Sequence, residues 1–250
     1  MATIPGVFQA GAWAFTAITL AMFVAGIIIQ QIQENQRWRS SDSRIVKTFL
    51  GRPTTLANIL NVGALACAVK AIAYWTQFYG VAIGAAPNYW GTYLGWVLFL
   101  FFVGHALAIY LCMRTGWHLV SPWLLALVAG TLLAASFVPI ANQLAFVLIS
   151  VGLMLVALIQ IGLFRIRMDW QSLVAIILLA VVYAGGYFVP YVLSPRYQIT
   201  ISNLASLIWY LIADFVVAAW FVFLAATALE CSAVEKKVEA MRAGLVCKKQ

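Results

Sequence analysis

Two ionisable residues, Lys70 and Asp214, lie in the middle of long apolar stretches, "ALACAVKAIAYW" and "WYLIADFVVAAW". An unpaired charge at the centre of a membrane helix costs at least about 2.5–3.5 kcal/mol, so such residues face a protein interior and find a partner. The two carry opposite charges, and no other acidic residue lies deep in an apolar stretch. We therefore expect an ion pair or hydrogen bond between Lys70 and Asp214. The alternatives are a Lys70 that is neutral or reaches toward the membrane surface, and a protonated Asp214 that bonds to a tyrosine.

Aromatic residues form the second group that could do chemistry. The stretch "NYWGTYLGW", residues 88–96, holds four rings, which are Tyr89, Trp90, Tyr93 and Trp96. The first two are expected at the membrane boundary, where tyrosine and tryptophan form interfacial belts. The last two lie deeper, and both pocket lining and ordinary packing stay open for them. Gly91 and Gly95 have the spacing that permits close approach of another helix or an oligomer contact.

The elements that must position these residues follow from composition. The chain is 65% hydrophobic and 9% charged, with a mean hydropathy of +0.98, which is typical of a membrane protein. A membrane helix needs about 20 apolar residues. Seven such runs are present, at 7–31, 56–79, 88–113, 118–138, 141–164, 171–193 and 202–229. We predict an all-α integral membrane protein: a seven-transmembrane-helix bundle over residues 1–230, followed by a basic cytoplasmic tail over residues 231–250.

The basic residues predict the orientation of this bundle. Thirteen lysines and arginines flank the helices on one side, whereas only Arg196 flanks them on the other. The positive-inside rule therefore places the N-terminus outside and the C-terminus in the cytoplasm. The net charge of +8 is explained by topology and by attraction to anionic membrane lipids, and it implies no nucleic-acid partner. The segment from Val234 to Val246 has amphipathic character, and we expect it to lie along the membrane surface or to fray.

Several kinds of chemistry are excluded by the motifs that the sequence lacks. It contains no HExxH, CxxC, Walker loop or GxSxG pattern, and its two histidines, His105 and His118, are far apart. His105 is expected to be a histidine satisfied within the bundle. A single deep carboxylate excludes paired-carboxylate hydrolysis. We therefore expect neither an enzyme nor a metal site.

The seven helices and their aromatic clusters together resemble the microbial (type I) rhodopsins. Proton pumps of that family carry Tyr-Trp-x-Arg-Tyr-x-Asp-Trp on the third helix, and residues 89–96 read Tyr-Trp-Gly-Thr-Tyr-Leu-Gly-Trp. Every aromatic position is retained, while Thr92 replaces the arginine and Gly95 replaces the aspartate counterion. On the seventh helix the family has Asp-x-x-x-Lys, whose lysine binds retinal as a Schiff base. This chain has Asp214 followed by Ala218 in that register.

The match on the other helices is less complete. On the second helix, "IAYWTQFYG" is similar to the segment that borders the retinal pocket of the family. On the sixth, "YAGGYFVPY" stands where the family has Trp-x-x-Tyr-Pro-x-x-Trp. Aligned on Tyr187, the first tryptophan becomes Ala184, the proline becomes Phe188 and the second tryptophan becomes Tyr191.

The resemblance implies a member without the retinal-attachment lysine. A protonated Schiff base needs an anion nearby, and a pump also needs a switchable acceptor and an arginine. The lysine, the third-helix counterion and the arginine are all replaced, so we expect no pump and no covalent retinal at Ala218. The residues expected to line a vestigial or noncovalent pocket are Lys70, Tyr93, Trp96, Tyr187, Asp214 and Ala218.

Three functions are compatible with this pattern. The first is a scaffold, regulatory or accessory subunit of a membrane assembly, with membrane lipids and a homo-oligomer or larger complex as partners. The second is a photosensory protein that binds retinal, a carotenoid or a lipid noncovalently, or binds retinal at Lys70 with Asp214 as counterion. The third is a proton or small-solute transporter or channel, although few polar residues lie at membrane depth.

Overall fold

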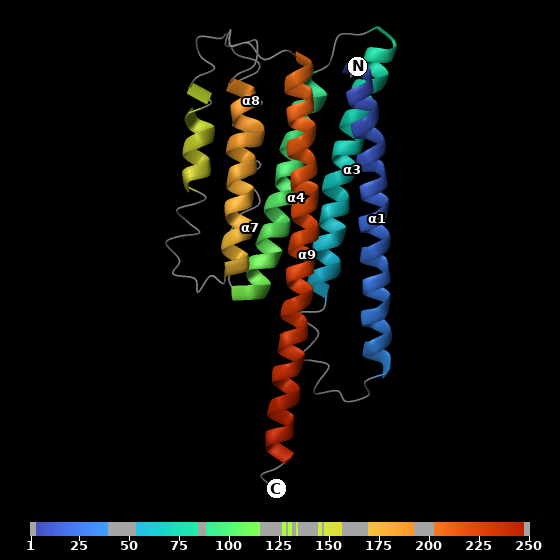
Figure 1. Ribbon diagram of the computed structural model, residues 1–250, viewed down its shortest axis with the longest axis vertical. Helices are drawn as coiled ribbons and strands as arrows, with labels where there is room; N and C mark the ends of the chain where they lie inside the picture. The colour runs from blue at the N-terminus through green and yellow to red at the C-terminus, as the bar shows by residue number, and fades with distance from the viewer. Residues whose placement is uncertain are drawn as a thin grey trace.

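The computed structural model describes residues 4–39, 54–84, 89–115, 170–192 and 203–247, together with short pieces between 127 and 156. The longer helices are α1 (Ile4–Arg39), α3 (Thr54–Ala82), α4 (Tyr89–Thr115), α7 (Trp170–Val181) and α9 (Asn203–Cys247). They lie roughly parallel to one long axis and run alternately in opposite directions, as in an up-and-down bundle (Figure 1). The helices predicted at 7–31, 56–79, 88–113 and 202–229 are therefore confirmed.

The surfaces of these helices suit a membrane. Ile4–Ile32, Ala57–Ala82 and Leu204–Ala228 are long and apolar enough to cross a bilayer, and Gly95–Tyr110 and Trp170–Gly186 are shorter apolar helices. Large apolar side chains point outward, including Trp13, Ile72 and Trp170, which are 60%, 66% and 68% exposed. Outward apolar faces of this extent are covered by lipid in a membrane protein. The chain is an integral, multi-pass membrane protein.

The fourth and fifth predicted helices fall largely outside the described residues. Residues 148–156 are helical and belong to the predicted helix at 141–164, and a few helical residues lie between 127 and 134. A buried polar link joins these pieces to the sixth helix. Ser150 donates a hydrogen bond to the Val128 carbonyl at 3.1 Å, and its hydroxyl lies 2.5 Å from that of Tyr183.

The sixth helix differs from the uninterrupted helix predicted at 171–193. After α7 it widens into a π-helix, η1 (Val182–Phe188), and then returns to α8 (Val189–Val192). Pro190 explains the change, because a proline inside a helix clashes with the carbonyl four residues earlier and donates no hydrogen bond. The Val189 amide instead donates to the Ala184 carbonyl, and the Gly185 carbonyl accepts a 3.0 Å hydrogen bond from the Trp209 indole.

The seventh predicted helix is much longer than a membrane span. α9 contains 45 residues and continues without interruption past residue 230 to Cys247. Its lower end, drawn in red, extends beyond the lower ends of α1, α3, α4 and α7 (Figure 1). The segment from Val234 therefore continues along the axis of the bundle, which differs from the prediction that it lies along the membrane surface or frays.

Candidate functional site

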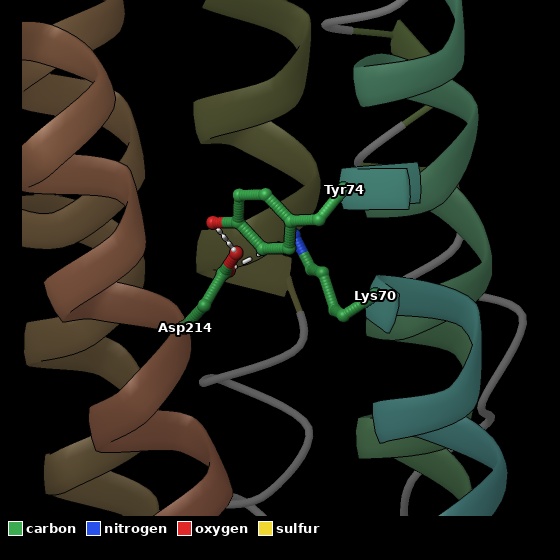
Figure 2. Close-up of polar contacts among 3 residues, drawn as sticks. All are labelled: Lys70, Tyr74 and Asp214. Atoms are coloured by element: carbon green, nitrogen blue, oxygen red, sulfur yellow. Dashed lines mark hydrogen bonds and ion pairs between the residues drawn. The ribbon is translucent and has the colours of Figure 1, made fainter. Parts of the chain in front are cut away.

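The two deep charged residues meet inside the bundle. Lys70 on α3 and Asp214 on α9 are 2% and 1% exposed, and the Lys70 Nζ atom lies 2.9 Å from Asp214 Oδ1 (Figure 2). The ion pair predicted from the sequence is present. It joins two residues that are 144 positions apart along the chain and gives each charge the partner that a low-dielectric interior requires.

Tyr74 completes the arrangement. It lies one turn after Lys70 on the same face of α3, and its hydroxyl donates a 2.8 Å hydrogen bond to Asp214 Oδ2 (Figure 2). Each carboxylate oxygen of Asp214 thus has a donor from α3. The sequence had offered a tyrosine only as an alternative to the lysine, whereas the structure brings both to the same carboxylate.

Aromatic rings enclose the ammonium group of Lys70. Its Nζ atom lies 4.7 Å from the ring centre of Phe99 and 5.6 Å from that of Trp96, both on α4. A cation over an aromatic face is attracted by the ring quadrupole, and the attraction is stronger away from water. Trp96 is itself 7% exposed and packs against Tyr210 of α9 with 4.6 Å between ring centres. Three helices therefore contribute to the surroundings of one lysine.

The first helix shapes the other side of the site. Phe15 of α1 stacks on Tyr74, with 5.7 Å between ring centres and 16° between ring planes. Gly11 allows this contact, since a Cβ atom at that position would lie 2.8 Å from the Tyr74 ring. A glycine is needed here because a larger residue would push α1 away from α3.

Two positions that differ from the pump pattern face the interior. Ala218 lies one turn after Asp214 on α9 and is 4% exposed, so the position that the sequence resemblance pairs with the attachment lysine is buried in protein. Gly95 is the residue that the sequence resemblance pairs with the third-helix counterion. A Cβ atom there would lie 3.0 Å from Cβ of Ala73, so the missing side chain permits close packing of α4 on α3. This contact supports the packing interpretation of Gly95.

Two of the predicted site residues stay predictions. The side chains of Tyr93 and Tyr187 lie outside the described part of the structure. His105 is exposed on α4 and stacks on Phe101 with 8° between ring planes, so the expectation of a histidine satisfied within the bundle is wrong. Its position follows from the helical period, which places it on a different face from Phe99 and Val103.

Sequence reasoning missed Tyr74, Phe99 and Phe15 as site residues. A usable signal existed for the first, because Tyr74 follows Lys70 by four residues and must share its face of the helix. Phe99 similarly follows Trp96 by three residues. No local signal identifies Phe15, because its contact with Tyr74 depends on how α1 packs against α3.

Comparison with known proteins places this geometry in a known fold. No protein-family model matches the sequence. No curated protein matches it either. Among solved structures, schizorhodopsin 4 superposes with a TM-score of 0.65 at 16% identity, over 90% of this chain and 98% of that one. Xanthorhodopsin, a light-driven ion pump with dual chromophore, gives 0.65 at 17% identity, over 93% and 97% of the two chains.

A cyanorhodopsin from the cyanobacterium Calothrix sp. NIES-2098 superposes with a TM-score of 0.56 at 17% identity, over 89% of this chain and 95% of that one. The likeness covers nearly the whole length of each neighbour, so it concerns the arrangement of the bundle as a whole. At this level of identity it establishes a shared fold.

Proposed function

We propose that this chain, which has the seven-helix fold of the microbial rhodopsins, is a non-pumping and non-enzymatic membrane protein that serves as a scaffold, regulatory or accessory subunit. The observation that carries the proposal is the buried contact between Lys70 and Asp214. The carboxylate that a rhodopsin of this fold would place beside its chromophore is bound here by an amine and a hydroxyl of the protein itself.

The surroundings of the pair support a structural role. A pump needs a carboxylate that gains and loses a proton during each cycle, together with a second group that receives it. Asp214 is the only acidic residue in the predicted spans, and Gly95 packs against Ala73 where the second carboxylate would stand. The pair instead ties α3 to α9, while Trp96 and Phe99 add α4 to the same contact.

The proposal is tested by purifying the tagged chain from its native membrane in mild detergent. An accessory subunit is expected to elute with a partner protein at a constant ratio, without visible absorbance. The double variant Lys70→Met/Asp214→Asn removes both charges together and is purified in the same way as a matched control. Comparing it with the wild-type chain shows whether recovery of the partner depends on the charged pair. A chain that elutes consistently by itself would contradict the proposal.

The same geometry favours one second candidate, a retinal protein with its lysine on the second helix. A primary amine condenses with an aldehyde to give an imine and water, and a protonated imine needs an adjacent anion in a low-dielectric site. Lys70 carries such an amine 2.9 Å from the carboxylate of Asp214, and Trp96 lies beside it. Retinal bound there would use Asp214 as counterion without a carboxylate from α4.

Adding all-trans retinal to the purified chain separates the two functions. A photosensory protein is expected to develop a visible band that shifts on acidification, is absent in Lys70→Ala and is retained in Lys236→Ala, a lysine of the C-terminal segment. Borohydride reduction followed by peptide mass analysis then locates the modified residue. Absence of any band in the wild-type chain rules out this second candidate.

A further inference from the structure

The part of α9 beyond the membrane span has no role in the site described above. The apolar span of this helix ends at Ala228, whereas the helix continues to Cys247. At about 1.5 Å per residue, these 19 additional residues extend roughly 28 Å along the helix axis. Figure 1 shows the C-terminal end of α9 projecting past the ends of the other labelled helices.

Apolar residues recur along the extension with alternating spacings of three and four. The residues in this series are Cys231, Val234, Val238, Met241 and Leu245. On a continuous helix such a series forms one stripe, and it corresponds to the a and d positions of a coiled coil. The helix of the structure runs through all five positions without a break. The stripe is therefore a surface suited to another helix.

The charges beside the stripe limit what that helix can be. Glu230 and Lys237 occupy g positions, while Glu235 and Arg242 occupy e positions. In a parallel pair, each g residue faces the e residue of the next heptad on the partner helix. Two copies of this chain inserted the same way would place Glu230 opposite Glu235 and Lys237 opposite Arg242. All of these contacts join like charges, so self-pairing through the extension is disfavoured.

We infer that the extension of α9 binds a parallel helix of a different membrane protein, whose charges are basic near the bilayer and acidic farther from it. Such a helix would place cations opposite Glu230 and Glu235 and anions opposite Lys237 and Arg242. A basic residue next to the bilayer is usual for a segment that emerges on the cytoplasmic side. This inference rests on the proposed accessory role and names the surface through which it would act.

The length of the stripe indicates that the partner is itself anchored in the membrane. Two and a half heptads are fewer than the three or four that an independent coiled coil needs. Anchoring both helices in one bilayer raises their effective concentration, which compensates for a short interface.

The first test measures binding to the full chain in lipid nanodiscs. The probe is a lipid-tethered designed peptide with leucine and isoleucine at a and d. Its e and g residues are basic where they face Glu230 and Glu235, and acidic where they face Lys237 and Arg242. A second peptide has the two charge blocks exchanged. We expect the first peptide to bind at least about tenfold more tightly than the second, since each like-charged contact opposes pairing.

A matched pair of variants locates the interface. Val238→Lys places a charge in the stripe, whereas Ala240→Lys places the same charge at a c position on another face of the helix. Binding of the first peptide should fall at least about tenfold in Val238→Lys and stay within about twofold in Ala240→Lys. Equal binding of the two peptides, or equal effects of the two variants, would overturn the inference and favour an extension that associates with lipid.

The second test reverses the e-position charges that disfavour self-pairing. In Glu235→Lys/Arg242→Glu, both parallel g-to-e contacts join opposite charges, so the chain should now dimerise. Lys236→Glu/Glu239→Lys makes the same net charge change at f and b positions and should not. Oxidative cross-linking at Cys231, an a position, measures the outcome in reconstituted membranes. A double variant that stays as monomeric as wild type would show that the extension does not use this register.

Failure of the docking surface is distinguishable from failure of the proposed accessory role. A native partner that is retained by Val238→Lys would overturn the docking surface and leave the accessory role intact. A wild-type chain that binds the designed peptide but has no native partner would support the surface and contradict the accessory role.

Discussion

At the scale of single residues, the molecule is organised around one carboxylate. Asp214 receives Lys70 on one oxygen and Tyr74 on the other, and both donors come from one face of α3. A buried ion pair contributes little compared with a well-packed apolar pair, but losing one partner leaves an uncompensated charge. The arrangement is therefore most sensitive to changes that remove one member and keep the other.

Lys70→Met is the direct test at this scale. It removes the cation beside the buried Asp214 carboxylate while Tyr74 still donates to it, and we expect the free energy of unfolding to fall by about 3–5 kcal/mol. Adding Asp214→Asn in the same chain should restore most of this loss, because the remaining amide is neutral and still accepts from Tyr74. Unfolding in detergent with increasing denaturant measures both. A single variant as stable as wild type would show that the pair is unimportant.

Tyr74→Phe tests the second donor. Removing a hydrogen bond to a charged group costs about 1.5–3 kcal/mol, and the ring contact with Phe15 is preserved. Tyr79→Phe is the matched control, because Tyr79 lies on the same helix and is 61% exposed. We expect a lower thermal midpoint for the first variant and no change for the second. Equal midpoints would mean that the Tyr74 hydroxyl does not contribute to stability.

At the scale of elements, the sixth helix shows how one residue changes a whole segment. Pro190 makes a regular helix unfavourable over the preceding turn, and η1 accommodates it by widening. The widened turn presents the Gly185 carbonyl to Trp209 and brings the backbone at Gly186 close to α9. The π-helix therefore sets the close approach of the sixth and seventh helices at this turn, while the Trp220 indole joins α9 to the Ala175 carbonyl of α7 farther along.

Two adjacent glycines allow a matched test of this contact. A Cβ atom at Gly186 would lie 2.7 Å from Cβ of Ala213, whereas a Cβ atom at Gly185 would meet nothing within 4 Å. We expect Gly186→Ala to lower the free energy of unfolding by about 1–3 kcal/mol, because the helices must separate. Gly185→Ala should be neutral or stabilising by up to about 1 kcal/mol. Denaturant titration of both variants decides it, and similar values would contradict the close approach.

At the scale of the whole molecule, the distribution of charge predicts how the bundle sits in its membrane. Basic residues concentrate in segment 32–55 and in the C-terminal part of α9. The C-terminal end of α1, where this segment begins, and the C-terminal end of α9 lie toward the same end of the bundle (Figure 1). Cytoplasmic segments of membrane proteins carry such an excess. The extension of α9 is therefore predicted to project into the cytoplasm, where a docking helix would meet it.

This orientation is tested with a fluorescent protein fused after Gln250 and an epitope before Ile4. In intact cells, protease added outside should remove the N-terminal epitope and leave the fused protein fluorescent. Permeabilised cells serve as the control, since both tags should then be digested. Protection of the N-terminal epitope in intact cells would place the bundle the other way up.

Much of the architecture follows from the sequence by itself, because membrane helices must satisfy their own backbone hydrogen bonds and be apolar outside. Length and hydropathy predicted the helices around Lys70 and Asp214, and the cost of an unpaired charge predicted that the two would meet. The burial of Ala218 one turn after Asp214 also follows from the helical period.

Contacts between helices were decided only by the tertiary structure. Which aromatic rings surround Lys70, which oxygen Tyr74 reaches, and whether Gly95 lines a pocket or permits packing all depend on how helices rotate and approach one another. Side-chain packing between distant segments sets those rotations, and no local pattern records them. The continuation of α9 beyond the bundle likewise required the structure, because its amphipathic sequence is equally compatible with a helix lying on the membrane surface.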